Sequence, residues 1–74
     1  MYIYKIKKEV NENPEIGSYT TYGIEAYTEH SSTPVSYISD AFADYEKAEE
    51  FVDLLNEHQA QPVHLEELCI DFIQ

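Results

Sequence analysis

The sequence is poor in the residues that serve covalent cross-linking and anion binding. Its 74 residues include one cysteine, two glycines, four lysines and no arginine or tryptophan. Cys69 cannot form a disulfide within the chain, which favours a reducing, intracellular setting. Without arginine the chain has no bidentate clamp for phosphate or carboxylate groups, and it has no glycine-rich phosphate loop. Enzymes that act on anionic substrates are therefore disfavoured.

Long apolar runs are also missing. No segment approaches the roughly 18 consecutive apolar residues that a membrane-spanning helix requires. Lysines interrupt the apolar residues near the start of the chain, so we expect no signal peptide. The sequence therefore predicts a cytoplasmic protein without a membrane segment.

Negative charge is abundant. The formal net charge is −11, and nine of the fifteen carboxylates follow residue 43, where a single lysine opposes them. Acidic surfaces repel nucleic acid phosphates and anionic lipids. We therefore expect no direct binding to nucleic acid or membrane, and we predict that a charged partner is basic.

The length predicts one domain over residues 1–74. A chain this short buries only about 60 to 65% of its surface, so its stability should be modest. Its hydrophobic content of 43% is nevertheless enough for a core. Seven tyrosines allow rings to be buried while their hydroxyls reach water or a partner.

Period-two alternation predicts three strands within residues 2–42, separated by turn-rich segments at 11–17 and 29–34. The strands are expected at 2–10, 18–28 and 35–42, in an antiparallel meander. Gly23 is expected to mark a bulge or a close contact. The inward face of the third strand is left open between Val35 with Tyr37 and Ile38. The residues predicted to face inward on the first two strands are Tyr2, Tyr4, Ile6, Val10, Tyr22, Ile24 and Ala26.

Helical periodicity follows. Asp44 is a good N-cap for a helix at about 44–59, and Pro62 suits the first turn of a second helix at about 62–73. The order predicts an α+β fold: a three-stranded antiparallel meander sheet followed by two helices packed on one face (βββαα). The predicted buried stripes are Ala48, Phe51, Val52 and Leu55 on the first helix, and Leu65, Leu68, Cys69, Phe72 and Ile73 on the second.

Several short motifs accompany this order. They are Tyr22–Gly23–Ile24, Ile38–Ser39–Asp40 ahead of a helix, Pro62–Val63–His64–Leu65–Glu66–Glu67–Leu68, and Asp71–Phe72. With these motifs the chain resembles a family of short uncharacterised proteins, a domain of unknown function, from Gram-positive anaerobic bacteria. The resemblance covers nearly the whole chain and implies no activity, ligand or catalytic residue.

A line of carboxylates on the first predicted helix is the most organised polar feature. Spacings of four, three and four place its members side by side, opposite the apolar stripe. One interpretation is a docking surface for a basic partner protein. A narrower one is a nucleic-acid mimic that inhibits a basic DNA- or RNA-binding protein. The alternative to both is an ordinary solvated helix face. The line consists of Glu46, Glu50, Asp53 and Glu57.

Four apolar or aromatic side chains fall on predicted outer surfaces. Ile70 lies on the polar side of the second helix, where it is either a partner-facing anchor or a stray surface residue. Ile3, Tyr19 and Tyr27 fall on the outer sheet face. They predict either a homodimer through the sheet face or cross-strand packing within one chain.

No cofactor and no metal are expected. His30, His58 and His64 are too scattered for a zinc signature, which favours structural or capping roles. A metal- or ligand-dependent regulatory domain that uses His58 and His64 is the remaining alternative. Cys69 is expected to be a small buried hydrophobe with a raised pKa.

We expect no enzymatic activity. A three-stranded, two-helix domain has little volume for a ligand pocket of about 300 Å³ or more. The leading hypothesis is a small non-enzymatic protein that binds another protein through its acidic helices or its tyrosine-bearing sheet face.

Overall fold

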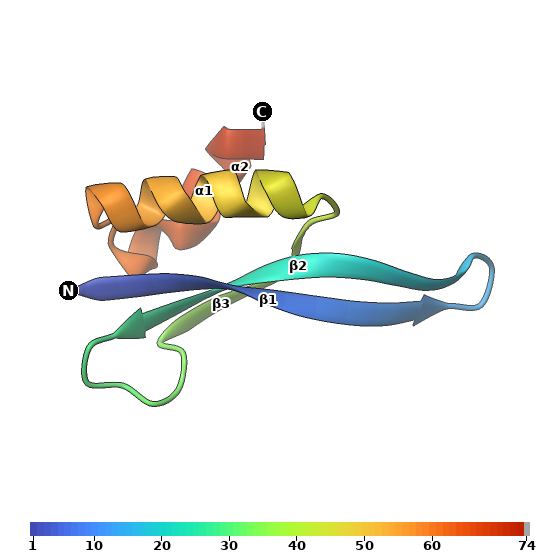
Figure 1. Cartoon of the computed structure of the whole chain (residues 1–74), viewed down its shortest axis with the longest axis horizontal. Helices are drawn as coiled ribbons and strands as arrows, with labels where there is room; N and C mark the ends of the chain where they lie inside the picture. The colour runs from blue at the N-terminus through green and yellow to red at the C-terminus, as the bar shows by residue number, and fades with distance from the viewer. Residues whose placement is uncertain (74) are drawn as a thin grey trace.

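The fold is the expected α+β arrangement. The computed structural model describes residues 1–73. An antiparallel sheet of order β1-β2-β3 is followed by two α-helices, which lie on one face of the sheet (Figure 1). The element bounds are β1 Tyr2–Asn13, β2 Gly17–Thr28, β3 Ser36–Phe42, α1 Tyr45–His58, the 3-10 turn η1 Pro62–His64, and α2 Leu65–Ile73.

The β1–β2 hairpin is longer than predicted. β1 continues to Asn13 and β2 begins at Gly17, and these two residues face each other across the turn. Polar side chains do not end a strand when its backbone groups still find partners in the neighbouring strand. Gly17 has φ 84°, a left-handed conformation that suits glycine in a tight turn.

The far half of this hairpin extends past the helices (Figure 1). Val10, predicted to face the core, is 66% exposed there, so that prediction was wrong. By strand alternation Val10 lies on the same face of β1 as Tyr4. It belongs to the far half of the hairpin, where no helix covers the sheet (Figure 1).

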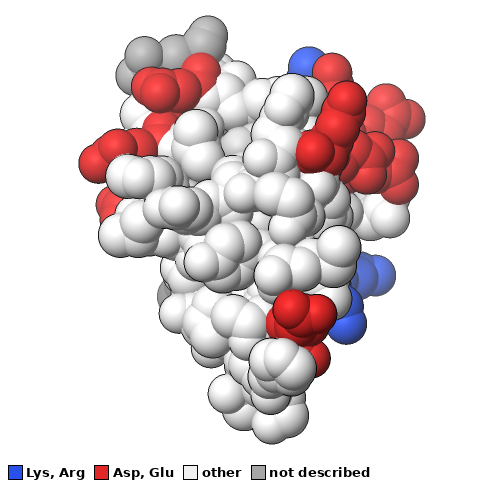
Figure 2. Space-filling model, turned by 90° about the vertical axis from the view of Figure 1, so that its left-hand side faces the viewer, with Lys and Arg blue, Asp and Glu red and all other residues white. Residues whose placement is uncertain are grey.

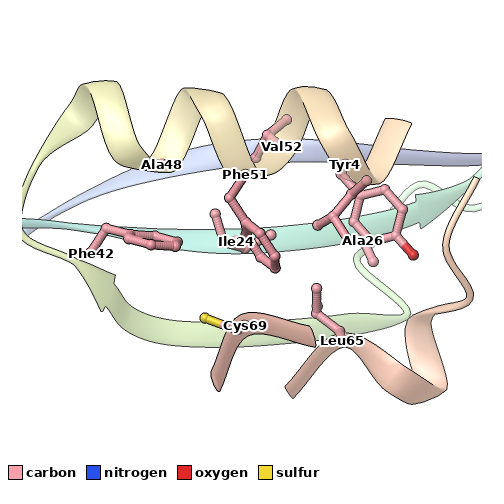
Figure 3. Close-up of a cluster of buried hydrophobic side chains, with 10 residues drawn as sticks. Tyr4, Ile24, Ala26, Phe42, Ala48, Phe51, Val52, Leu65 and Cys69 are labelled. Atoms are coloured by element: carbon pink, nitrogen blue, oxygen red, sulfur yellow. The ribbon is translucent and has the colours of Figure 1, made fainter. Parts of the chain in front are cut away.

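The core lies between the sheet and the two helices (Figure 3). All four residues of the predicted α1 stripe are buried, which confirms that prediction. From the sheet, Ile24 and Ala26 are fully buried, and Phe42 of β3 is buried as well. Of the residues left open for the inward face of the third strand, Ile38 packs on the core, whereas Val35 and Tyr37 are exposed. The buried set is Tyr4, Ile24, Ala26, Phe42, Ala48, Phe51, Val52, Leu55, Leu65 and Cys69.

The second helical segment is only partly as predicted. Pro62 opens the 3-10 turn η1, and α2 itself has nine residues. Leu65 and Cys69 are buried, whereas Ile73 is 59% exposed, contrary to its predicted place in the buried stripe. α2 packs over β3, one of the two edge strands, so its last turn has less sheet to cover it. No helix within residues 1–73 has both the length and the apolar character to cross a bilayer.

The end of α1 is tied to the edge of β1. Asp44 caps the start of α1 as predicted, accepting a hydrogen bond from the Glu46 N–H at 3.0 Å. At the other end, the Asn56 side-chain amide accepts from the Tyr4 N–H at 2.8 Å and donates to the Tyr4 carbonyl at 3.1 Å. Gln59 makes the same pair of bonds to Tyr2, at 2.9 and 3.1 Å. The two amides therefore replace a neighbouring strand at the start of β1.

Candidate functional site

A groove runs between the two helices. α1 contacts all three strands and chiefly β1, whereas α2 contacts β3, and the two helix backbones stay apart along most of their length. They leave a hollow of about 390 Å³. Its lining is largely apolar and consists of Phe51, Leu54, Leu55, His58, Ala60, Leu68, Asp71 and Phe72.

Aromatic rings close one end of this groove. The ring centroid of Phe51 lies 5.5 Å from that of Phe42 and 5.1 Å from that of Phe72. Phe42 and Phe72 meet edge to face at 5.9 Å. These separations are typical of favourable aromatic pairs, so the cluster holds both helices to the sheet.

A second hollow of about 380 Å³ continues the groove beyond these rings. It shares Phe72 and is bordered by Lys47, Glu50 and Ile73. The expectation that so small a domain has little room for a hollow of about 300 Å³ was therefore wrong. The reason is that α1 packs chiefly over β1 and α2 over β3, so the two helices meet through the Phe51–Phe72 contact and leave space on either side of it.

The predicted line of carboxylates lies on the solvent side of α1, and Glu50 is the member that borders the groove's continuation. Glu46, Glu50, Asp53 and Glu57 are all exposed, on the side of α1 opposite its buried residues. Glu50 forms an ion pair of 4.0 Å with Lys47. Within residues 1–73, no cationic group lies within 4 Å of the other three carboxylates. Figure 2 shows acidic side chains in separate groups around an uncharged central surface.

The remaining candidate residues are not brought together. Ile70 is 50% exposed but does not line the groove. Tyr27 pairs with Ile3, whereas Tyr19 pairs with Asn11 far out on the hairpin. Eight residues of strand separate the two tyrosines, which is about 27 Å. Ile3, Tyr19 and Tyr27 therefore do not form one patch.

Contacts within the chain occupy much of the outer sheet face. The Lys5 ammonium lies 5.1 Å from the centroid of the Tyr27 ring, and the Lys7 ammonium lies 5.5 Å from that of Tyr37. Tyr27 is half-buried as a result. This geometry corresponds to the cross-strand packing that the sequence left as an alternative.

Glu9 bridges from β1 across β2 to β3 on this outer face. Its carboxylate accepts hydrogen bonds from the Tyr37 hydroxyl, from the Ser39 hydroxyl at 3.0 Å and from the Asp40 N–H at 2.8 Å. Asp40 has φ 53°, and the β2–β3 register shifts at this point. The irregular backbone thus presents its N–H to Glu9.

Gly23 makes room for this bridge. A Cβ atom at position 23 would lie 2.7 Å from the Ile38 carbonyl oxygen and 3.0 Å from Oε1 of Glu9. The prediction that Gly23 marks a bulge or a close contact is therefore confirmed.

The bridge makes stability depend on pH. Hydrogen bonds from the Tyr37 hydroxyl, and next from the Asp40 N–H, hold the pKa of the Glu9 carboxyl below its ordinary value of 4.5. Because the folded-state pKa is the lower one, the stabilisation is complete above the unfolded-state pKa. It is lost as pH falls through the folded-state pKa.

We therefore predict that Glu9→Gln lowers the melting temperature near neutral pH by about 5 °C. The difference between variant and wild type should shrink as the pH falls below about 4. Thermal melts followed by circular dichroism from neutral pH to about pH 3 measure it. Glu15→Gln, at an exposed glutamate in the turn that follows the same strand, is the control and should have little effect. A difference that does not change with pH would contradict this account.

The histidines and Cys69 are not arranged for metal binding or thiol chemistry in the described part of the chain. Among residues 1–73, no group of three or more histidine, cysteine or acidic side chains is placed to hold a metal ion. His58 lines the groove, whereas Nδ1 of His64 lies 3.9 Å from Glu67. Cys69 is buried, and burial raises the pKa of its thiol, as predicted.

Sequence reasoning missed the groove. The available signal was Leu54, an apolar residue just outside the predicted buried stripe of the first helix. An apolar residue outside an already complete buried face indicates a second apolar contact. Leu54 is 41% exposed and lines the groove opposite Leu68 of α2.

Together these features define a class: a small α+β domain whose helical layer presents an apolar groove with acidic borders. The chain belongs to a family of unknown function (DUF6514), whose model matches residues 1–74. The resemblance to an uncharacterised family is thereby confirmed. Comparisons with curated proteins and with solved structures gave no match.

Proposed function

We propose that this chain is a small, non-enzymatic cytoplasmic protein that works by binding another protein, in a Gram-positive bacterial cell as the resemblance implies. The α1–α2 groove is the docking site, and its occupant is a basic, amphipathic segment of the partner. The observation that carries the proposal is an apolar hollow of about 390 Å³ set between two acidic helices.

The apolar part of the groove supplies binding energy. Leu54 is 41% exposed, and Leu68 and Phe72 are half-buried, so a partner has apolar surface left to cover. Removing such apolar surface from water stabilises a complex by about 25 cal/mol per Å². Grooves of this kind bind helices through apolar anchors at i, i+3 or i+4, and i+7.

Charge selects the partner. Asp71 lines the groove, Glu50 borders its continuation, and the other carboxylates of the α1 line are exposed on the same helix. Lys47 is the only lysine after residue 43, so lysine or arginine side chains that flank the partner's apolar face would be attracted. A second copy of this chain is a poor occupant because it carries the same −11 charge.

The nucleic-acid mimic remains the competing explanation of the acidic line. A mimic would bind its target through the carboxylates alone, so binding would depend on Glu50 and Asp53 and would not depend on Leu54. Binding in the groove would depend both on these carboxylates and on Leu54.

We predict that Leu54→Gln weakens partner binding at least about tenfold, as expected when a central apolar anchor is removed. Wild type, Leu54→Gln and Glu50→Lys with Asp53→Lys should be compared as baits in affinity capture from the source cell. Ile70→Gln is the matched control, since Ile70 is an exposed helix residue outside the groove. It should retain the partner.

The two mechanisms give different outcomes. Loss with both the leucine and the charge variants supports the groove. Loss with the charge variant alone supports the mimic and overturns the groove, and equal capture by all variants overturns both.

A further inference from the structure

The far half of β1 has a free edge. Tyr2 and Tyr4 point their backbone N–H and C=O groups away from β2, towards Asn56 and Gln59. In an antiparallel strand this direction repeats at every second residue. Ile6, Lys8, Val10 and Glu12 therefore direct their backbone groups away from β2 as well. Within residues 1–73, no hydrogen bond is made to these outward backbone groups.

Such an edge is a template for another strand. The amides of Asn56 and Gln59 block only its first part, at Tyr2 and Tyr4. Beyond them the hairpin projects from the helical layer (Figure 1), and Val10 is 66% exposed. The open stretch is thus bounded by a block at one end and by the turn at the other.

The charge of this stretch differs from that of the rest of the chain. β1 carries three of the four lysines, Lys5, Lys7 and Lys8, and only two carboxylates, Glu9 and Glu12. Two copies of the protein can therefore approach through β1 without bringing their acidic helices into contact.

We propose that two copies of this chain pair through their β1 edges, antiparallel and centred on Val10, to form a continuous six-stranded sheet. Val10 of one copy lies opposite Val10 of the other, where its exposed side chain finds cover. Lys8 of each copy lies opposite Glu12 of the second copy. The proposal uses a strand edge instead of the outer sheet face, and it does not depend on the groove.

The charges select this register from its neighbours. Residues with outward backbone groups must face one another, so the pair can be centred on Lys8, Glu9, Val10, Asn11 or Glu12. Centring it on Glu9 would place Glu9 opposite itself, and centring it on Asn11 would place Val10 opposite Glu12, so neither register pairs Lys8 with Glu12. Centring the pair on Lys8 would place Lys8 opposite itself, and like charges directly opposite each other are destabilising. Centring it on Glu12 would place Glu12 opposite itself, again with like charges directly opposite each other. Only the register centred on Val10 forms two Lys8–Glu12 pairs.

A charge exchange tests this pairing. Lys8→Glu and Glu12→Lys should each weaken dimerisation at least about tenfold, because each places two like-charged pairs across the interface. The double variant restores both pairs with reversed sign and should dimerise like wild type. An equimolar mixture of the two single variants should form a heterodimer, since each mutated residue then faces an opposite charge.

Sedimentation velocity over a concentration series is the measurement. Wild type should shift towards twice the monomer mass of 8.6 kDa as concentration rises. Lys47→Glu changes the net charge as Lys8→Glu does but lies on α1, so it should dimerise like wild type. Circular dichroism establishes that the variants fold. A monomeric wild type, unimpaired single variants, or a mixture and double variant that stay monomeric would each overturn the proposal.

Discussion

Phe51→Ala is expected to lower the free energy of unfolding by about 3 to 5 kcal/mol. Phe51 is 3% exposed, and its ring packs against those of Phe42 and Phe72. Truncation removes the ring from the core and leaves a cavity at the point where both helices meet the sheet. A domain of this length has about 4 to 11 kcal/mol of stability in total, so the variant should be close to unfolded.

Urea denaturation followed by circular dichroism measures this loss. Leu54→Ala is the matched control on the same helix, because Leu54 is 41% exposed and keeps less of its surface in the core. It should cost about 1 kcal/mol. Equal effects of the two substitutions would show that the aromatic cluster is not the centre of the fold.

Gly23→Ala is expected to cost about 2 to 4 kcal/mol, far more than an alanine usually costs in a strand. The new Cβ would lie 2.7 Å from the Ile38 carbonyl oxygen, which belongs to the backbone of β3 and cannot rotate away. It would also lie 3.0 Å from Oε1 of Glu9 and would push that carboxylate off its partners on β3. Steric strain and lost hydrogen bonds therefore add.

A double-mutant cycle with Glu9→Gln separates the steric strain from the loss of the Glu9 hydrogen bonds. If the alanine already breaks the bridge, Glu9→Gln should cost little more in its presence. Gly17→Asn is the control for a glycine change: Gly17 has φ 84°, which asparagine tolerates, and nothing lies within 4 Å of a Cβ there. Strictly additive effects of Gly23→Ala and Glu9→Gln would contradict the proposed role of Gly23.

Local periodicity was sufficient to predict the fold. Alternation identified the inner row of β2, with Ile24 and Ala26, and helical spacing identified Phe51 and its neighbours on α1. These patterns are properties of single elements, so one sequence carries them. The cap at Asp44 is equally local.

Other features depend on how elements are placed relative to one another. Val10 and Ile73 have the right periodicity to be buried, but the helices end before the hairpin does and α2 covers only an edge strand. The amide pairing of Asn56 with Tyr4 joins residues 52 positions apart. No local sequence pattern predicts a contact between residues so far apart in the chain.

The groove between α1 and α2 also depends on how the elements are placed relative to one another. The width of the space between α1 and α2 is set by the sheet beneath them, so the apolar stripes alone did not reveal it. Of the acidic line that the sequence singled out, Glu50 borders the groove's continuation, and the prediction that the line is a docking surface stays a prediction. Leu54 and Leu68 nevertheless line an apolar groove on the same helical layer, and an ordinary solvated helix face would lack such a groove.

An NMR titration of the isotope-labelled protein with a synthetic helical peptide tests the groove most directly. The peptide, about 15 residues long, carries leucines at helical spacing and lysines elsewhere, and a peptide of the same composition without that spacing is its control. The account predicts amide shifts centred on Leu54, Leu68 and Phe72 that the control peptide does not produce. Equal shifts with both peptides, confined to the exposed carboxylates of α1, would contradict it.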